Sequence, residues 1–293
     1  YGNTKDEAKE VKDELNIADI LLMVSNDLVV FDNLANKAFL LTHVNPETQS
    51  YDQAMAYLDT IEADIDRPLV KQDYQSDNLT TQDFSSSFGE QNYKDVVEHI
   101  QRYIVAGDVM QVVPSQRLSA PYKAPSVELY RQLRRLNPSP YMYYLNLGDV
   151  DIIGSSPEIL TRVDSQRRAT VRPIAGTRAR GKDPAHDLAL EKDLLADEKE
   201  IAEHLMLIDL GRNDLGRIAK TGSVKLTDKM FVERYSHVMH IVSNVECDLK
   251  DNMSAMDALK ATFPAGTLSG APKVRAMEII NEVESLKRNI YSG

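Results

Sequence analysis

The sequence contains a single cysteine, Cys247, among its 293 residues. One cysteine cannot form an internal disulfide, and it is too few for a zinc or iron–sulfur site built on cysteine ligands. This scarcity is typical of a protein from a reducing compartment, so we expect a cytoplasmic location.

Long apolar runs and an excess of basic residues are also missing. No segment is apolar for long enough to span a bilayer, and no charged-then-apolar leader stands at the start, so no membrane is expected. Lys and Arg number 34 against 45 Asp and Glu, a net charge of −11, which argues against nucleic acid as a partner. A small anion is still allowed, because salt screens distant charges beyond about 8 Å while charges lining a cleft act directly.

The sequence is otherwise that of a soluble globular protein, with 42% hydrophobic and 27% charged residues. Its length suits one large or two small domains. Strand-like segments are joined by hairpins and interspersed with single helices, which predicts an α+β fold with a largely antiparallel sheet. The predicted strands are 17–31 (two strands around a turn at 25–27), 37–44, 110–118, 141–147, 150–154, 169–174 and 238–245. The predicted helices are 51–65, 93–106, 126–136, 197–207, a short one from 254, and one ending near 284.

A polar stretch at 66–90, rich in Ser, Gln and Asp, is the best linker candidate. It separates residues 1–65, with strands and one helix, from residues 91–293. Within the second part, the acidic stretch 182–200 is expected to be mostly exposed.

Two glutamates organise the chemistry that the sequence suggests. Glu200 and Glu203 are three residues apart on the predicted helix 197–207, so they lie on one side of it. Such a pair can hold a hard divalent cation such as Mg²⁺, although an isolated pair is more often a solvated acidic face. Because the helix runs on through apolar residues at 205–208, we expect Glu203 to border the core.

Two glycine-containing segments and one histidine add to this pair. The segment 173–178 brings a strand to Gly176, where a backbone without Cβ can approach a ligand, or can simply turn. The loop 266–271 precedes a helix, whose free N–H groups can bind an anion; the alternative is a tight structural turn. His240 lies in line with apolar residues on a strand, where a core role is commoner than proton transfer.

Together these features indicate a metal-assisted enzyme acting on a small anion. No phosphate-binding loop or dinucleotide fingerprint is present, which excludes the common nucleotide sites. In the stretch after the glutamates, we expect Arg212 and Asp214 to form a local ion pair.

Several long stretches resemble the chorismate-utilising enzymes, and within that family the anthranilate synthases. They include YIVAGDVMQVVPSQR, IIGSSPEIL, RPIAGTRARG, DEKEIAEHLMLIDLGRNDLGRI, ERYSHVMHIVSNVE and FPAGTLSGAPKVRAMEII. The resemblance implies an antiparallel β-sheet sandwich with helices on the outside and the active site in a central cleft. It also implies conversion of chorismate and ammonia to anthranilate and pyruvate with Mg²⁺, the ammonia coming from a separate glutamine amidotransferase subunit.

The resemblance assigns roles to individual residues. It implies that Glu203 binds Mg²⁺, that Glu200 holds the metal shell and assists catalysis, and that His240 transfers a proton at the ring. The implied substrate contacts are Gly176, Thr177, Thr267 and Tyr291, and part of a feedback site for tryptophan is implied at Pro140, Tyr141 and Met142.

Two residues depart from the family pattern, since Cys247 and Ser292 stand where glycine is usual. Ser292 adjoins Tyr291 and could perturb that contact. The resemblance further implies family segments on both sides of this sequence, so residues 1–65 are expected to be the remnant of a regulatory region and 91–293 an incomplete catalytic domain. We therefore expect the 293-residue chain to be inactive by itself.

Three positions separate the branches of the family. Members that add water to chorismate resemble one another in carrying lysine where Gln111 stands and glutamate where Arg172 stands, and aminodeoxychorismate synthases carry lysine where Ala175 stands. These differences favour anthranilate as product over isochorismate, salicylate or aminodeoxychorismate. A non-catalytic chorismate- or anthranilate-binding regulator, or an interaction protein, is the alternative from another class. The retained glutamate pair and histidine argue against it.

Overall fold

The structure, a computed structural model, describes residues 11–70, 73–74 and 79–291. It combines helices with strands, and the pairings between its named strands are antiparallel, which confirms the predicted α+β class. The chain divides into two compact units, Ile17–Tyr74 and the remainder. The roles predicted for 1–65, 66–90 and 91–293 stay predictions.

The smaller unit contains one hairpin and one helix, β1 (Asp27–Asp32), β2 (Lys37–Thr42) and α1 (Tyr51–Ile65). The helix matches its predicted bounds because Ser50 forms a capping box with Gln53. The prediction of a strand before residue 25 is wrong. The side chains at 20–24 are more than half exposed, and among the described residues this run pairs with no strand. An apolar run becomes a strand only where a neighbour supplies backbone partners.

A five-stranded sheet forms the centre of the larger unit. Its middle strand is β12 (Val238–Asp248), which pairs along one edge with β11 (Lys225–Arg234). The other edge of β12 is shared by β10 (Ile174–Ala179) and β9 (Arg168–Val171), and β8 (Arg162–Val163) pairs with β9. The alternation predicted for β12 is confirmed, since Met239, Ile241 and Val245 are fully buried on one face and His240 lies on the other.

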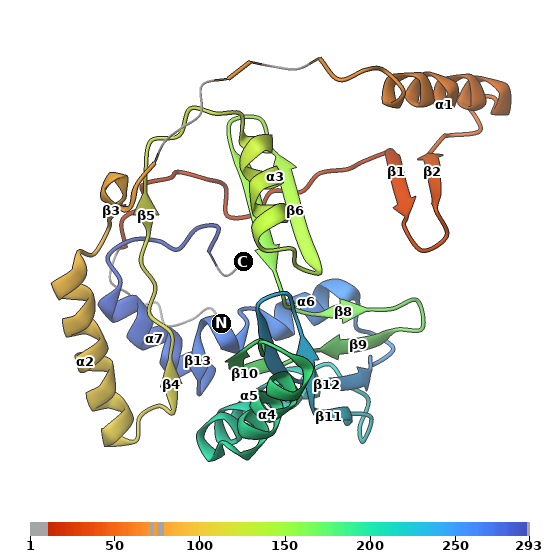
Figure 1. The fold of residues 1–293 in the computed structure, drawn as a ribbon. Coiled ribbons are helices and arrows are strands. Elements are labelled where there is room, and N and C mark those ends of the chain that lie inside the picture. The colour runs from red at the N-terminus through yellow and green to blue at the C-terminus, as the bar shows by residue number, and fades with distance from the viewer. Residues whose placement is uncertain (1–10, 71–72, 75–78, 292–293) are drawn as a thin grey trace. The chain divides into compact units, whose positions relative to one another are not determined.

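Helices α4 (Pro184–Ala196) and α5 (Glu198–Gly216) lie against β10 and β12 (Figure 1). The predicted helix 197–207 is therefore confirmed, but α5 continues beyond it to Gly216. Its buried stripe is also displaced, because Leu205 is 43% exposed while His204 and Ile208 are buried. The acidic stretch 182–200 is mostly exposed, as predicted, although α4 buries Asp187 and Leu194.

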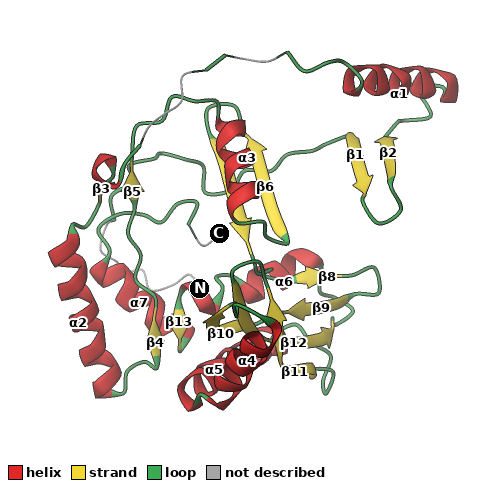
Figure 2. Cartoon of the chain, in the orientation of Figure 1, coloured by secondary structure: helices red, strands yellow, loops and turns green. Residues whose placement is uncertain are grey.

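A second layer of the larger unit joins segments that are distant in sequence (Figure 2). Helix α2 (Glu90–Ala106) ends at Gly107, which has φ +83, and packs with α7 (Lys273–Val283) through Ile100 and Ile279. Next to α7, β4 (Gln111–Val112) pairs with β13 (Gly270–Ala271). The other elements of this unit are η1 (Thr81–Asp83), β3 (Ser85–Ser86), β5 (Leu118–Ser119), α3 (Ser126–Leu136), β6 (Tyr141–Asn146), β7 (Asp151–Ser156), α6 (Ala255–Thr262) and η2 (Gly266–Leu268). None of the helices in the described part of the chain has the length and apolarity that a bilayer span requires.

Candidate active site

Strands β10 and β12 bring three of the predicted site residues together. Thr177 is the register partner of His240, and Thr177 Oγ1 lies 3.0 Å from His240 Nδ1. The carbonyl oxygen of Gly176 lies 3.2 Å from the same nitrogen. Since a carbonyl can only accept, this contact places the proton on Nδ1, and proton exchange with a ligand then falls to Nε2. Gly176 has φ +74 at a bulge in β10, so this segment is a bulged strand and not an ordinary turn.

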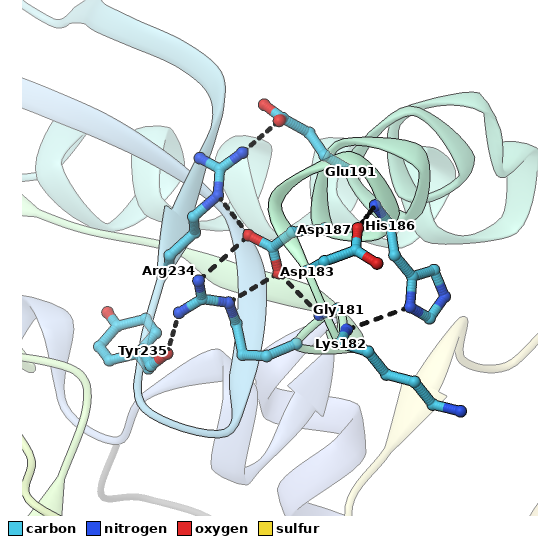
Figure 3. Close-up of polar contacts among 9 residues, drawn as sticks. Gly181, Lys182, Asp183, His186, Asp187, Glu191, Arg234 and Tyr235 are labelled. Carbon is cyan, nitrogen blue, oxygen red and sulfur yellow. Dashed lines mark hydrogen bonds and ion pairs between the residues drawn. The ribbon is translucent and has the colours of Figure 1, made fainter.

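The buried carboxylate of Asp187 gathers donors from Gly181 and Arg234 (Figure 3). Asp187 accepts from Arg180 Nε at 2.9 Å and Nη2 at 3.1 Å, from Gly181 N at 2.7 Å, and from Arg234 Nε at 3.0 Å. These donors hold the pKa of Asp187 well below its usual range, and the Arg180 guanidinium has the largest effect. Arg180 Nη1 also donates to the carbonyl of Tyr235, at 2.7 Å, and the Tyr235 ring packs edge-on against His240 with centroids 5.5 Å apart. The cluster thus fixes the wall on one side of the histidine.

Helix α5 presents the two glutamates, both half-buried. Asp197 begins the helix by accepting from the backbone N–H groups of Lys199 and Glu200. Glu203 Oε1 accepts from Gln111 Nε2 at 3.2 Å, so β4 supplies a neighbour from 92 residues away. Glu200 Oε1 lies 3.9 Å from Arg178 Nη1. Each glutamate therefore already has a polar or cationic neighbour.

The glycine-containing loop 266–271 forms η2 and β13. Thr267 Oγ1 donates to Glu158 Oε2 at 3.3 Å, and both residues line a cavity of about 40 Å³. This volume admits water but not a ring-sized ligand. Ser269, the neighbouring hydroxyl, is buried and donates to the carbonyl of Ala265, so it serves the fold of the loop.

Glu158 is a site residue that the sequence interpretation missed. Burial raises its pKa to about 7, against the opposing effect of the hydrogen bond from Thr267. A carboxyl group that keeps its proton near neutral pH is suited to proton transfer. The available signal was an acidic residue placed directly before the apolar Ile159 and Leu160.

We expect Glu158→Gln to stabilise the fold at alkaline pH. The raised pKa means that, between pH 4.5 and about 7, the folded state holds a proton that the unfolded state has lost. Stability therefore falls as pH rises through this window and stays low above it. At about pH 8 the variant should gain up to about 3 kcal/mol in free energy of unfolding, and at about pH 4.5 the gain should vanish. Urea unfolding at both pH values measures this, with the exposed Glu198→Gln as control; a gain that is equal at both would contradict the assignment.

Comparison with known proteins decides the family. The sequence model of a family described as chorismate binding enzyme matches residues 2–293. The chain belongs to this family. It is 55% identical over 285 residues to anthranilate synthase component 1 of Pseudomonas putida, an alignment that covers 96% of this chain and 58% of that protein. The chain thus spans little more than half the length of such relatives.

Solved structures of chorismate-binding enzymes share the fold. Anthranilate synthase component I from Streptococcus pneumoniae TIGR4 superposes with a TM-score of 0.81 at 41% identity, covering 92% of this chain and 59% of that one. The menaquinone-specific isochorismate synthase of Escherichia coli gives a TM-score of 0.70 at 22% identity, covering 88% and 59%, which shows likeness of fold alone.

The glutamate pair on α5 suits magnesium in its chemistry. Mg²⁺ prefers oxygen ligands and commonly takes one or two carboxylates, with water and substrate groups completing its shell. Within the described ranges no group of three or more His, Cys, Asp or Glu side chains could hold a metal, so the protein offers no closed cage there. Glu203 and Glu200 are the residues that would hold the ion. Once bound, it would neutralise charge on a substrate carboxylate or leaving oxygen.

The remaining family-implied residues lie outside these clusters. Tyr291 packs under the Arg288 guanidinium, 5.5 Å from the ring centroid, and Arg288 donates to Leu268 O at 2.7 Å, next to Thr267. Pro140 precedes β6, where Tyr141 and Met142 pair with β7. Ser292 lies outside the described residues. No comparison tests the roles assigned to these side chains.

One expectation near the site can be settled, and one departure from the family pattern can be located. The predicted ion pair between Arg212 and Asp214 is wrong: Arg212 pairs with Asp209 at 3.1 Å, and Asp214 pairs with Lys273 at 2.6 Å. Residues two apart on a helix face different sides, whereas residues three apart meet. Cys247 is a core side chain, 2% exposed, and burial raises its pKa to about 11.

Proposed function

We propose that the protein containing this chain is the large subunit of an anthranilate synthase, which converts chorismate and ammonia to anthranilate and pyruvate. The similarity to relatives named anthranilate synthase component 1 supports this activity. The contact between Gln111 and Glu203 is the observation that favours ammonia over water as the nucleophile. In water-adding members the resemblance puts lysine at position 111, where a neutral amine could deprotonate water. A glutamine amide cannot take that proton, and ammonia needs no such base.

The described side chains divide the remaining work. In this proposal Glu158, whose pKa is raised to about 7, gives a proton to a leaving hydroxyl, and His240 Nε2 exchanges one at the ring. Thr177 and the backbone at Gly176 hold the histidine in its tautomer. Arg172 cannot stand in for the glutamate of the water-adding branch, because it donates to Asn244 and is paired with Glu233.

The proposal extends to cofactor, partners and location. They are Mg²⁺ at Glu200 and Glu203, a glutamine amidotransferase subunit that supplies ammonia, L-tryptophan as inhibitor with contacts at 140–142, and a cytoplasmic setting. That the 293-residue chain is inactive by itself stays a prediction.

We expect anthranilate and pyruvate in equimolar amounts when the full-length protein is incubated with chorismate, Mg²⁺ and ammonium. Mass spectrometry of the products measures this, and a reaction without ammonium is the control. Isochorismate, salicylate or aminodeoxychorismate as main product would overturn the choice of nucleophile. Chorismate that binds in equilibrium dialysis but stays unchanged would favour the non-catalytic alternative.

A further inference from the structure

The buried ion pair between α5 and α7 carries an inference that does not depend on the reaction. Asp214 and Lys273 are each 4% exposed, and Asp214 Oδ2 accepts from Lys273 Nζ at 2.6 Å. Lys273 Nζ also donates to Thr262 O at 3.0 Å. Burial raises the pKa of Asp214 and lowers that of Lys273, while the short contact between opposite charges opposes both shifts.

One oxygen of this pair has no partner among the described residues. Asp214 Oδ1 is buried, yet no hydrogen bond reaches it. Leaving a buried carboxylate oxygen unpaired is costly, so native structures usually satisfy such atoms with water. Asp214 lines the cavity of about 40 Å³ that Glu158 and Thr267 also line. Most of its lining is apolar, but Glu158, Thr267 and Asp214 bring polar groups to it, and it is large enough for water.

We propose that the cavity holds an ordered water molecule that donates to Asp214 Oδ1 and links the Asp214–Lys273 pair to the carboxyl group of Glu158. Asp214, Lys273 and Glu158 would then form one polar unit.

This unit has an electrostatic consequence. The negative end of the ion pair borders the cavity, and a like charge nearby favours the protonated form of Glu158. The other charged side chain lining the cavity, Arg172, is already paired with Glu233. Removing the Asp214 charge would leave Lys273 without its counter-ion, so Glu158 should give up its proton more readily.

The test follows the titration of the Glu158 carboxyl group by ¹³C NMR. The sample is the 293-residue chain labelled in its glutamate side chains. The Glu158 resonance is assigned as the one that is lost in Glu158→Gln. In Asp214→Asn the titration midpoint should fall by about one pH unit, as expected for loss of one charge at short range. In the double variant Asp214→Asn with Lys273→Met it should lie between the single variant and the parent. Asp209→Asn, an exposed change on the same helix, should leave it unmoved.

Circular dichroism confirms that each variant is folded, and the double variant keeps the test decisive if Asp214→Asn unfolds. A crystal structure of the parent should show water density within hydrogen-bond distance of Asp214 Oδ1. A dry cavity, or a midpoint that moves equally in Asp209→Asn, overturns the proposal.

Discussion

Replacing Glu203 by glutamine should abolish magnesium-dependent turnover in the full-length protein. Glu203 is half-buried, and its carboxylate accepts a hydrogen bond from Gln111. A neutral amide is a poor ligand for a hard cation, and charge neutralisation by a bound metal lowers the activation barrier by several kcal/mol. We expect kcat/KM to fall about a thousandfold or more. Steady-state kinetics across Mg²⁺ concentrations, with calorimetry of Mg²⁺ binding, measures both effects.

The matched control is Glu198→Gln, the same chemical change on the same helix at an exposed position. It should leave turnover within twofold or so of the parent. Glu200→Gln should weaken Mg²⁺ binding about 10- to 100-fold if it holds the metal shell. Parent-like activity and Mg²⁺ affinity in Glu203→Gln would show that the metal is held elsewhere.

Gly270→Ala should cause a large loss of stability. Gly270 has φ +141, and an added Cβ would lie 2.1 Å from the backbone oxygen of Gln111. Real contacts do not reach this distance, so β13 would have to part from β4. Backbone strain and overpacking together predict a loss of at least about 3 kcal/mol in free energy of unfolding, measured by urea denaturation.

The control separates strain from collision. Gly222 also has positive φ, +78, but an added Cβ there meets open space. Gly222→Ala should therefore cost only about 1 kcal/mol. Because Gln111 contacts Glu203, Gly270→Ala should also impair turnover in any protein that stays folded, while Gly222→Ala should not. Equal losses of stability in the two variants would contradict the clash.

Features set by local sequence could be predicted. The capping residues Ser50 and Ser254 give α1 and α6 their starts, and both capping boxes are present. The period-two alternation of β12 placed His240 on the face opposite Met239 and Ile241. Residue roles, however, came from resemblance to a family, since a lone histidine on a strand carries little information by itself.

Features set by contacts between distant segments could not be predicted. Nothing local in the sequence indicates that Lys273 would meet Asp214, 59 residues away, or that Gln111 would meet Glu203. The buried stripe of α5 was misplaced at Leu205 because apolar residues surround that turn and only the packing partner selects a face. Glu158 was missed for the same reason, since burial, and not residue type, raises its pKa.

The layout of the five-stranded sheet bears on how the protein folds. Ile174 pairs with Val242 about 70 residues along the chain, and α4 and α5 fill the interval between them. Closing so long a loop is entropically slow, whereas the two helices need only near neighbours in sequence. We expect the glutamate-bearing helix to acquire structure early and the strand that carries His240 to dock late. The strand β12 would then dock against α5 only in the last steps of folding, and a ribosome-bound chain could not complete this packing before residue 248 has emerged.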